Sequence, residues 1–403
     1  MTSVPTHALA RPTDDFHLPG VPDIRDPYPF LAAAADREPV THVGEMDISA
    51  LGRRDAYIVY GYQDCVEVLR NGQTFTTAPM HDIVGPAMGR TILEMAGDEH
   101  RAHRGIVAHA FRPKVLARWT DEVIVPAAHE VIDRFVDAKR ADLVADFTFH
   151  FPAQVIARLL GLPRSDIARF QRWATAIIAV AARPTDGVAA AAEVREYLAP
   201  FIAARRTAPE DDLISELVTA QFEGRALTDE EIHPFLLLLL PAGVETTYRG
   251  IGNLMVALLT HTDQLDAVLA DRSRVVDAVE EALRWEPPIP MLTRECDHAT
   301  QVHGVDVPGR ALMNVCTGMA NRDASQWANP HAYDLDRSHK QNLTFGFGAH
   351  MCLGAHLARI EMRVALDALL GRLPGLRLHP DADDVHIHGM AFRSPISLPV
   401  VWD

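Results

Sequence analysis

The 403-residue sequence contains no hydrophobic run long enough to cross a bilayer. Its longest apolar stretch, residues 235–244, is roughly half of the ~20 residues that a membrane-spanning helix requires. The N-terminus lacks a basic start followed by an apolar core and a small-residue cleavage site, the pattern of a signal peptide. We therefore expect a cytoplasmic protein with no membrane attachment.

Basic residues are scarce, with 38 lysines and arginines against 54 aspartates and glutamates and a formal net charge of −16. Because an acidic surface repels phosphate groups, this balance argues against a nucleic-acid-binding protein. There is one local exception to the acidic character. Five basic residues gather within eighteen positions, namely Arg101, Arg104, Arg112, Lys114 and Arg118.

The four cysteines include no C-x-x-C pair, which argues against a zinc ribbon. A disulfide framework is also not expected in a cytoplasmic protein. Cys65 is predicted to occupy a small buried position in a helix, and Cys296 and Cys316 similar positions in strands. Cys352 has a different sequence context, because glycines and aromatic residues precede it.

Hydrophobic periodicity predicts a mainly α-helical chain with a smaller β region. We expect an N-terminal extension over residues 1–25 and one domain over residues 26–403. The expected helices are 27–38, 100–111, 121–137, 151–160, 165–182, 188–206, 211–222, 229–261, 273–285 and 353–370. Strands are expected near residues 55–60, within 293–315 and in the tail over 376–402.

The longest expected helix, residues 229–261, has start signals and an internal defect. Thr228 and Glu231 form the sequence pattern of a capping box at its start. Pro241 lies inside it, where proline removes a backbone hydrogen bond and is expected to kink the helix. Such a defect is often retained for a ligand.

Cys352 follows a segment rich in glycine and aromatic residues, F-G-F-G-A-H-M-C-L-G over residues 345–354. Gly348 and Gly354 would permit a tight turn and the close approach of a flat group. A cysteine at a helix N-terminus is favoured as a thiolate, and a thiolate is a soft metal ligand. The alternative is an inert, buried cysteine behind a glycine loop.

The spacing F-x-x-G-x-x-x-C-x-G, continued by A-H-L-A-R, resembles the haem-ligand loop of the cytochrome P450 family. The resemblance implies a single triangular domain, mainly α with a smaller β region, and haem b (iron protoporphyrin IX) bound through the Cys352 thiolate. It also implies a monooxygenase that consumes O2. The E-x-x-R pair Glu281 and Arg284, with Arg337 as a third member, would brace the loop beneath the haem.

Two further motifs match this family. Residues 242–247, A-G-V-E-T-T, resemble its oxygen-activation motif, in which Glu245 and Thr246 would be the catalytic pair that relays protons. Without the resemblance, the same two side chains could face solvent or bond to the preceding helical turn. The residues that the resemblance assigns to haem binding are His100, Arg104, Ala242, Gly243, Arg294, Phe345, Gly346, His350, Cys352 and Gly354.

The segments that this family uses for selectivity are largely apolar or small here, which predicts a medium-sized hydrophobic substrate such as a terpenoid, a steroid or a polyketide-like compound. The expected substrate contacts are Met80, Ile83, Val84, Leu238, Ala242, Met291, Leu292, Ala391 and Phe392.

No reductase is fused to the domain, so the resemblance implies a separate ferredoxin and ferredoxin reductase as electron donors. The expected docking face carries basic residues that would oppose an acidic donor, namely Arg101, Arg112, Lys114, Arg118, Lys340 and Arg363. A monomer is expected. Two alternatives remain at this point, a peroxide-driven haem-thiolate enzyme and a non-enzymatic haem sensor or carrier.

Overall fold

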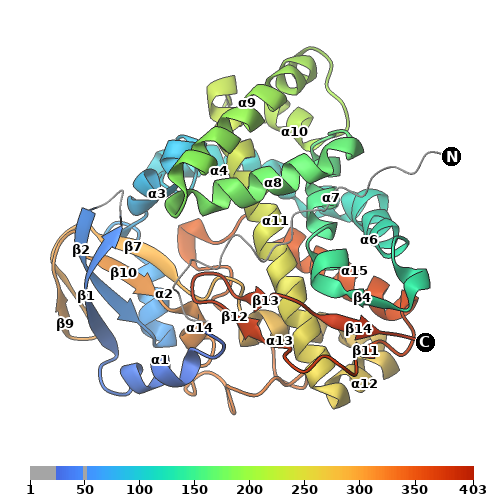
Figure 1. The fold of residues 1–403 in the computed structure, drawn as a ribbon. Coiled ribbons are helices and arrows are strands. Elements are labelled where there is room, and N and C mark those ends of the chain that lie inside the picture. The colour runs from blue at the N-terminus through green and yellow to red at the C-terminus, as the bar shows by residue number, and fades with distance from the viewer. Residues whose placement is uncertain (1–23, 49–51) are drawn as a thin grey trace.

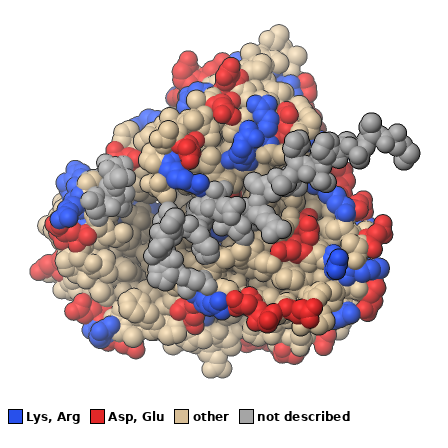
Figure 2. All heavy atoms as spheres, in the orientation of Figure 1, with Lys and Arg blue, Asp and Glu red and all other residues tan. Residues whose placement is uncertain are grey.

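The structure is a computed structural model that describes residues 24–48 and 52–403. Nearly all of the extension expected over residues 1–25 therefore lies outside the described residues. The described chain folds into one body with a roughly triangular outline, a β-rich corner and a larger helical part (Figures 1 and 2). None of its helices is long and apolar enough to span a membrane.

The helices of the described residues account for most of the fold, as the periodicity predicted. They are α1 Tyr28–Ala35, α2 Tyr62–Arg70, α3 Pro79–Met88, α4 Gly97–Ala108, α5 Pro113–Trp119, α6 Val125–Ile132, α7 Phe151–Leu159, α8 Ile167–Ile178, α9 Pro184–Thr207, α10 Leu213–Thr219, α11 Asp229–Thr260, α12 Thr262–Ala270, α13 Val275–Trp285, α14 Thr317–Ala320 and α15 Ala355–Arg372.

The strands are short and form one main sheet and several smaller ones. They are β1 Val40–Ile48, β2 Gly52–Val59, β3 Phe75–Thr76, β4 Arg140–Asp142, β5 Gln221–Phe222, β6 Arg225–Ala226, β7 Leu292–Cys296, β8 Thr300–Val302, β9 Val305–Val307, β10 Leu312–Val315, β11 Arg377–Leu378, β12 Ile387–His388, β13 Ser394–Pro395 and β14 Pro399–Val401.

The main sheet has the strand order β1-β2-β10-β7-β3 and joins distant parts of the chain. The pair β10 and β2 is parallel, with Leu312 opposite Ala56, whereas the other pairs are antiparallel. In the pair β10 and β7, Met313 lies opposite Arg294. This register fixes the position of Arg294 along β7, and Arg294 is one of the residues of the site described below.

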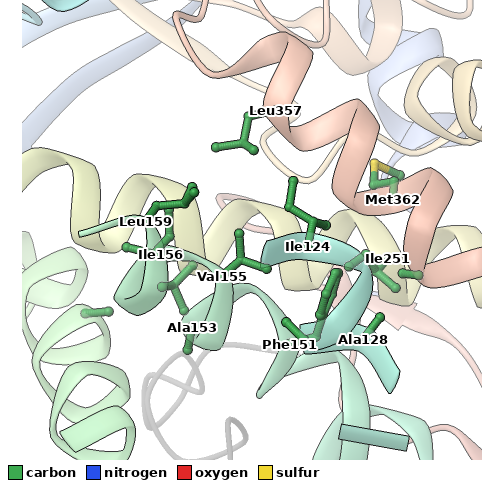
Figure 3. Close-up of a cluster of buried hydrophobic side chains, with 14 of the residues drawn as sticks. Ile124, Ala128, Phe151, Ala153, Val155, Ile156, Leu159, Ile251, Leu357 and Met362 are labelled. Atoms are coloured by element: carbon green, nitrogen blue, oxygen red, sulfur yellow. The ribbon is translucent and has the colours of Figure 1, made fainter. Parts of the chain in front are cut away.

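The core surrounds α11, which runs through the middle of the molecule (Figure 1). Apolar side chains from α6, α7, α11 and α15 meet there, among them Ala128, Phe151, Ile251, Leu357 and Met362 (Figure 3). Burial of such side chains stabilises the fold by roughly 1.5–3 kcal/mol each. α11 is thereby held rigidly and can position functional side chains.

The start of α11 matches its prediction, and the helix is continuous through its middle. The capping box of Thr228 and Glu231 is present. α11 continues as one helix through Pro234 and Pro241. The kink expected at Pro241 stays a prediction, while an end of the helix at that proline is excluded.

Several expected helices are shorter than predicted, and for two of them another element replaces one end. The helix expected over residues 121–137 is divided into a π-helical turn, Thr120–Ile124, and α6, which ends at Ile132. The helix expected over residues 211–222 ends at Thr219, because its last residues pair as β5 with β6. Tertiary pairing outweighs helix propensity at such ends.

Candidate active site

The Cys352 loop is a closed backbone turn that begins at Phe345 and ends just before α15. The Cys352 amide donates a hydrogen bond to the Phe345 carbonyl at 2.8 Å. Gly346 and Gly348 have φ values of +71° and +75°, a region that favours glycine. A Cβ at Gly348 would also meet the carbonyl oxygen of Leu69 at 2.9 Å. The loop conformation therefore requires both glycines.

Gly354 lies in a tight turn, as expected, although its φ of −81° does not require glycine. The Ala355 amide donates to the Cys352 carbonyl at 3.4 Å, so Leu353 and Gly354 form a turn between Cys352 and α15. Gly354 is also the N-cap of α15, which begins at Ala355. Cys352 consequently precedes the helix instead of lying in its first turn.

The Cys352 thiol is accessible to solvent although protein surrounds it on most sides. Burial raises the pKa of the Cys352 thiol, whereas the amide of Gly354 and the guanidinium groups of Arg104 and Arg359 lower it. The groups expected to stabilise a thiolate at Cys352 are thus present. Without a metal ion, however, burial has the larger effect on the pKa of this cysteine and favours the protonated thiol. A metal ion would reverse that balance, because a coordinating thiol is deprotonated.

Four basic side chains assigned to haem carboxylates lie together beside this loop. His100 and Arg104 come from α4, Arg294 from β7, and His350 from the loop itself. The ring centroids of His100 and His350 are 4.1 Å apart. Arg104 donates a hydrogen bond to the Met351 carbonyl, which attaches α4 to the loop. The four residues therefore share one location, as the sequence predicted.

Their surroundings disfavour positive charge. Burial lowers the pKa of Arg294 to about 10. Burial, together with His100, Arg294 and Arg104, lowers the pKa of His350 to about 3. Burial also lowers the pKa of His100, whose buried Nε2 has no hydrogen-bond partner among the described residues.

No carboxylate is among the causes of these shifts. A partly buried basic cluster without an acidic partner fits a ligand that brings its own negative charge. Haem carries two propionates, and the accessible thiol of Cys352 lies next to the same cluster. The residues present therefore fit haem.

A stripe of α11 is accessible although the residues around it in the helix are buried. Leu238 and Thr246 are half-buried and Ala242 between them is exposed, although Leu237 and Val244 are fully buried. Residues four apart share one face of a helix, so these three side chains lie on one accessible face, and the space beside this face is called the chamber below. The other residues expected to contact substrate are also half-buried or exposed, namely Met80, Ile83, Val84, Met291, Leu292, Ala391 and Phe392.

The neighbours of two glycines show which segments pack close together here. A Cβ at Gly346 would lie 3.6 Å from Cδ1 of Leu292, so an expected substrate contact adjoins the Cys352 loop. A Cβ at Gly243 would meet Ile156 of α7 at 2.6 Å. Gly243 therefore permits close packing of α11 against α7, in addition to any contact with a cofactor.

Glu245 and Thr246 point in different directions from α11, because successive helical residues are rotated by about 100°. The Thr246 hydroxyl donates to the Ala242 carbonyl at 2.7 Å. Glu245 is 1% exposed and accepts hydrogen bonds from Thr175 of α8 and from Arg249, both at 3.2 Å. Burial raises the pKa of the Glu245 carboxyl, and Arg249 acts against this rise.

The brace expected from Glu281, Arg284 and Arg337 is confirmed. Nε and Nη2 of Arg284 donate to the two Glu281 oxygens at 2.8 and 2.7 Å, and Nε of Arg337 donates to one of them at 3.0 Å. Arg284 also donates to the Asn321 carbonyl at 2.9 Å, and Asn321 donates to Thr344 at 2.9 Å. Since Thr344 precedes Phe345, this chain of hydrogen bonds connects the brace to the Cys352 loop.

Three polar residues of the site were missed in the sequence. Arg249 could have been found, because it lies four positions after Glu245 in a helix, the spacing of an ion pair. Thr175 and Asn321 gave no such signal, since their partners are 70 and 23 positions away. Only the fold brings them together.

Comparison with known proteins shows what the chain is similar to. The sequence model of the family described as Cytochrome P450 matches residues 185–382. The erythromycin C-12 hydroxylase of Saccharopolyspora erythraea is 35% identical over 380 residues, which cover 91% of each protein. The mycinamicin IV hydroxylase/epoxidase of Micromonospora griseorubida is 36% identical over 86% of this chain and 90% of that protein.

The solved structures agree with the sequence comparisons. The cytochrome P450 PksS of the Bacillus subtilis bacillaene polyketide synthase superposes with a TM-score of 0.86 at 30% sequence identity. The match covers 94% of this chain and 97% of that one. The fold expected from the Cys352 loop is thereby confirmed over nearly the whole chain.

Proposed function

The chain belongs to the cytochrome P450 family of haem-thiolate monooxygenases, and on that premise we propose that it hydroxylates a hydrophobic small molecule with electrons from a ferredoxin. The observation that carries the proposal is the Cys352 loop beside four basic groups, of which His100 and Arg294 are buried. Cys352 would be the metal ligand of haem b. His100, Arg104, Arg294 and His350 would bind its propionates.

When bound, haem supplies the activation of O2, which the thiolate promotes by donating electron density. The protein's own residues would hold the substrate and transfer protons. Leu238 and Ala242 would hold the substrate and displace water from the chamber. Thr246 would hold a proton at its Oγ1 near the reacting oxygen, and Glu245 would exchange protons with it.

For the substrate we propose a medium-sized hydrophobic compound, with a polyketide-like molecule as the first class to test. The names of the two hydroxylases and of PksS refer to macrolide or polyketide compounds. The α11 stripe, with its aliphatic side chains, would suit such a substrate. Screening macrolides, terpenoids and steroids for a shift of the Soret band to shorter wavelength tests this, and a response to none of them would contradict it.

Thr246→Ala should bind substrate and accept electrons normally but should lose most of its product, with the electrons appearing in hydrogen peroxide. A positioned proton donor typically contributes 10²–10⁴-fold, so we expect a fall in product per electron on the order of a hundred-fold. Thr247→Ala is the matched control, since Thr247 is buried and lies off the stripe. Unchanged coupling in Thr246→Ala would exclude the relay.

This experiment also separates the proposal from peroxide-driven chemistry. An enzyme that uses peroxide directly needs no proton relay from Thr246 for reductive activation, and would form product from peroxide in both variants. The sensor or carrier alternative is not favoured, because the relatives are named as hydroxylases.

We further propose that the donor docks over α4, α5 and the Cys352 loop, with Arg112 and Lys114 as its main contacts. Arg101 forms an ion pair with Glu223 at 2.8 Å and Arg118 with Asp211 at 2.7 Å, so their charge is partly neutralised. Both Arg112 and Lys114 are exposed and enter no ion pair of the described residues. On the face drawn in Figure 2, acidic and basic groups are interspersed.

The double variant Arg112→Glu with Lys114→Glu should slow reduction by ferredoxin by about ten-fold or more at low salt, because steering by local charge is lost. The salt dependence should become flatter. Arg53→Glu with Arg140→Glu is the control, since it makes the same change in net charge at exposed positions of β2 and β4. Reduction at the unaltered rate in the first variant would mean that the donor docks elsewhere.

The monomeric state and the cytoplasmic location stay predictions. So does the identity of the prosthetic group as haem b, which extraction and mass measurement of the bound porphyrin would test.

A further inference from the structure

A turn that carries two expected substrate contacts is closed by its own backbone. It comprises residues 389–392 and is called the Phe392 turn below. Ala391 in this turn is exposed and Phe392 is half-buried. Gly389 has a φ of +96°, and a Cβ at this position would meet the carbonyl oxygen of Phe392. Glycine is therefore required at the start of the turn, because the chain folds back onto itself there.

Arg393, the residue after the Phe392 turn, is a fully buried cation. Its side chain is 1% exposed, and its ion-pair partner Glu286, the C-cap residue of α13, is 5% exposed. Nε of Arg393 donates to Oε1 of Glu286 at 2.6 Å, and Nη2 donates to Oε2 at 3.4 Å. Separating the two groups would leave each charge buried without a partner, so the Arg393 side chain is held in one place.

The Arg393 guanidinium also binds backbone carbonyls of two distant segments. Nη1 donates to the Gly389 carbonyl at 2.5 Å, across the Phe392 turn, and Nη2 donates to the Arg25 carbonyl at 2.8 Å, before α1. The Gly389 amide in turn donates to the Ile24 carbonyl at 3.0 Å. A guanidinium presents five donors in a planar fork, so it joins these acceptors in one fixed arrangement, which the single ammonium group of a lysine cannot do.

The backbone of Arg393 attaches the turn to a second substrate-contact segment and to α11. The Arg393 amide donates to the Pro288 carbonyl at 2.9 Å, three positions before the expected substrate contact Met291. Nδ2 of Asn253 in α11 donates to the carbonyls of Arg393 and Glu286, at 3.1 and 3.0 Å. The Phe392 turn, the residues after α13 and α11 are thus joined at one residue.

We propose that Arg393 is a positioning residue for substrate selection, which fixes the Phe392 turn against α11 and residues 288–292 and thereby sets the shape of one side of the chamber. Arg393 does not touch substrate, since its side chain is fully buried. The proposal rests on the proposed function for the contact of the Phe392 turn with substrate. It adds that selectivity depends on a residue outside the chamber and on the Glu286 carboxylate that holds it.

The expected effect on binding follows from the entropy of ordering a loop. A turn that is already held in the binding conformation loses little conformational entropy when a ligand arrives, whereas a loosened turn must be ordered at that moment. The loss of affinity applies only to ligands large enough to touch the turn. A small ligand that binds at the haem iron and reaches no further should be unaffected, and it therefore provides an internal reference.

Imidazole and clotrimazole are the probes, because both bind haem iron through an imidazole nitrogen and only clotrimazole extends three aryl rings into the chamber. Shifts of the Soret band of the ferric holoenzyme measure both dissociation constants. In Arg393→Met the preference for clotrimazole over imidazole should fall by about ten-fold, with the affinity for imidazole unchanged within about two-fold. Arg393→Lys keeps the charge beside Glu286 but lacks the fork of donors, so it should fold and lose about three-fold of the preference.

A double-mutant cycle with Phe392→Ala tests whether Arg393 acts through the turn. Phe392→Ala alone should lower the preference for clotrimazole, because it removes the side chain that the turn presents. Adding Arg393→Met to Phe392→Ala should cause a smaller further loss than Arg393→Met causes in the wild type, since both changes act through the same contact.

Arg205→Met is the control for the general effect of a broken buried ion pair. Arg205 and Asp212 are 2.6 Å apart with side chains 9% and 3% exposed, and they lie on α9 and before α10. This variant should be less stable but should keep the wild-type preference for clotrimazole.

Two outcomes would overturn the proposal. The first is a folded Arg393→Lys or Arg393→Met holoenzyme with the wild-type preference. The second is an equal loss from Arg393→Met with and without Phe392→Ala, because the effect of Arg393 would then not pass through the turn. If the expected changes in probe binding are found but the holoenzyme forms no product, the proposed activity fails and the role of Arg393 stands.

Discussion

Cys352→Ala should abolish oxygenation completely, with no product above background from any substrate that the wild type accepts. The sulfur is the one soft ligand that the site offers beside its basic cluster, and without a thiolate the metal loses both its anchor and its electron donor. Product analysis and the haem content of the purified protein measure the effect.

Cys296→Ala is the matched control for this variant. Cys296 is fully buried in β7, and burial raises the pKa of its thiol to about 11, so it is an inert packing residue. We expect normal turnover and haem content with a modest loss of stability from the small cavity. Product formation by Cys352→Ala would refute the assigned ligand.

Glu281→Ala should have the largest effect on folding of the substitutions considered. It would leave Arg284 and Arg337 buried without their common partner and would break the path through Asn321 to the Cys352 loop. Removing one partner of a buried ion pair typically lowers the free energy of unfolding by about 3–5 kcal/mol. Denaturant unfolding measures this loss, and haem content should fall with it.

A surface ion pair of the same chemistry provides the comparison. Asp367 accepts from Arg272 at 2.6 Å, but their side chains are 65% and 35% exposed. Asp367→Ala should therefore lower the free energy of unfolding by less than about 1 kcal/mol. Equal losses in Glu281→Ala and Asp367→Ala would show that the brace does not stabilise the fold.

Long periodic helices were predictable from the sequence, and short elements were not. α11 has a capping box and sustained apolar spacing, so its bounds were found to within one residue. α2 and α12, of nine residues each, were missed, although α7 of the same length was predicted. α3 was missed because it contains Gly85 and two prolines, which normally indicate a turn, and only its packing in the fold makes it helical.

In the candidate site, too, some parts were predictable from the sequence and others were not. The Cys352 loop was predictable, because it is a pattern of residue types at short and definite spacing. The brace came from the family resemblance, since Arg337 lies 56 positions from Glu281. The meeting of His100, Arg294 and His350 could not be derived from local spacing and came from the family resemblance. The contacts of Glu245 with Thr175 and Arg249 were not predicted, since periodicity alone does not tell which segments cover each face of a largely apolar helix.

The absorption spectrum of the reduced, CO-bound holoenzyme tests the central claim most directly, because the position of its Soret band depends on the axial ligand. If Cys352 is the ligand, the wild type should show the band position of a thiolate-ligated haem, and Cys352→Ser should lose it. A histidine-type carbonyl spectrum in the wild type, or a thiolate-type spectrum that survives in Cys352→Ser, would contradict the account.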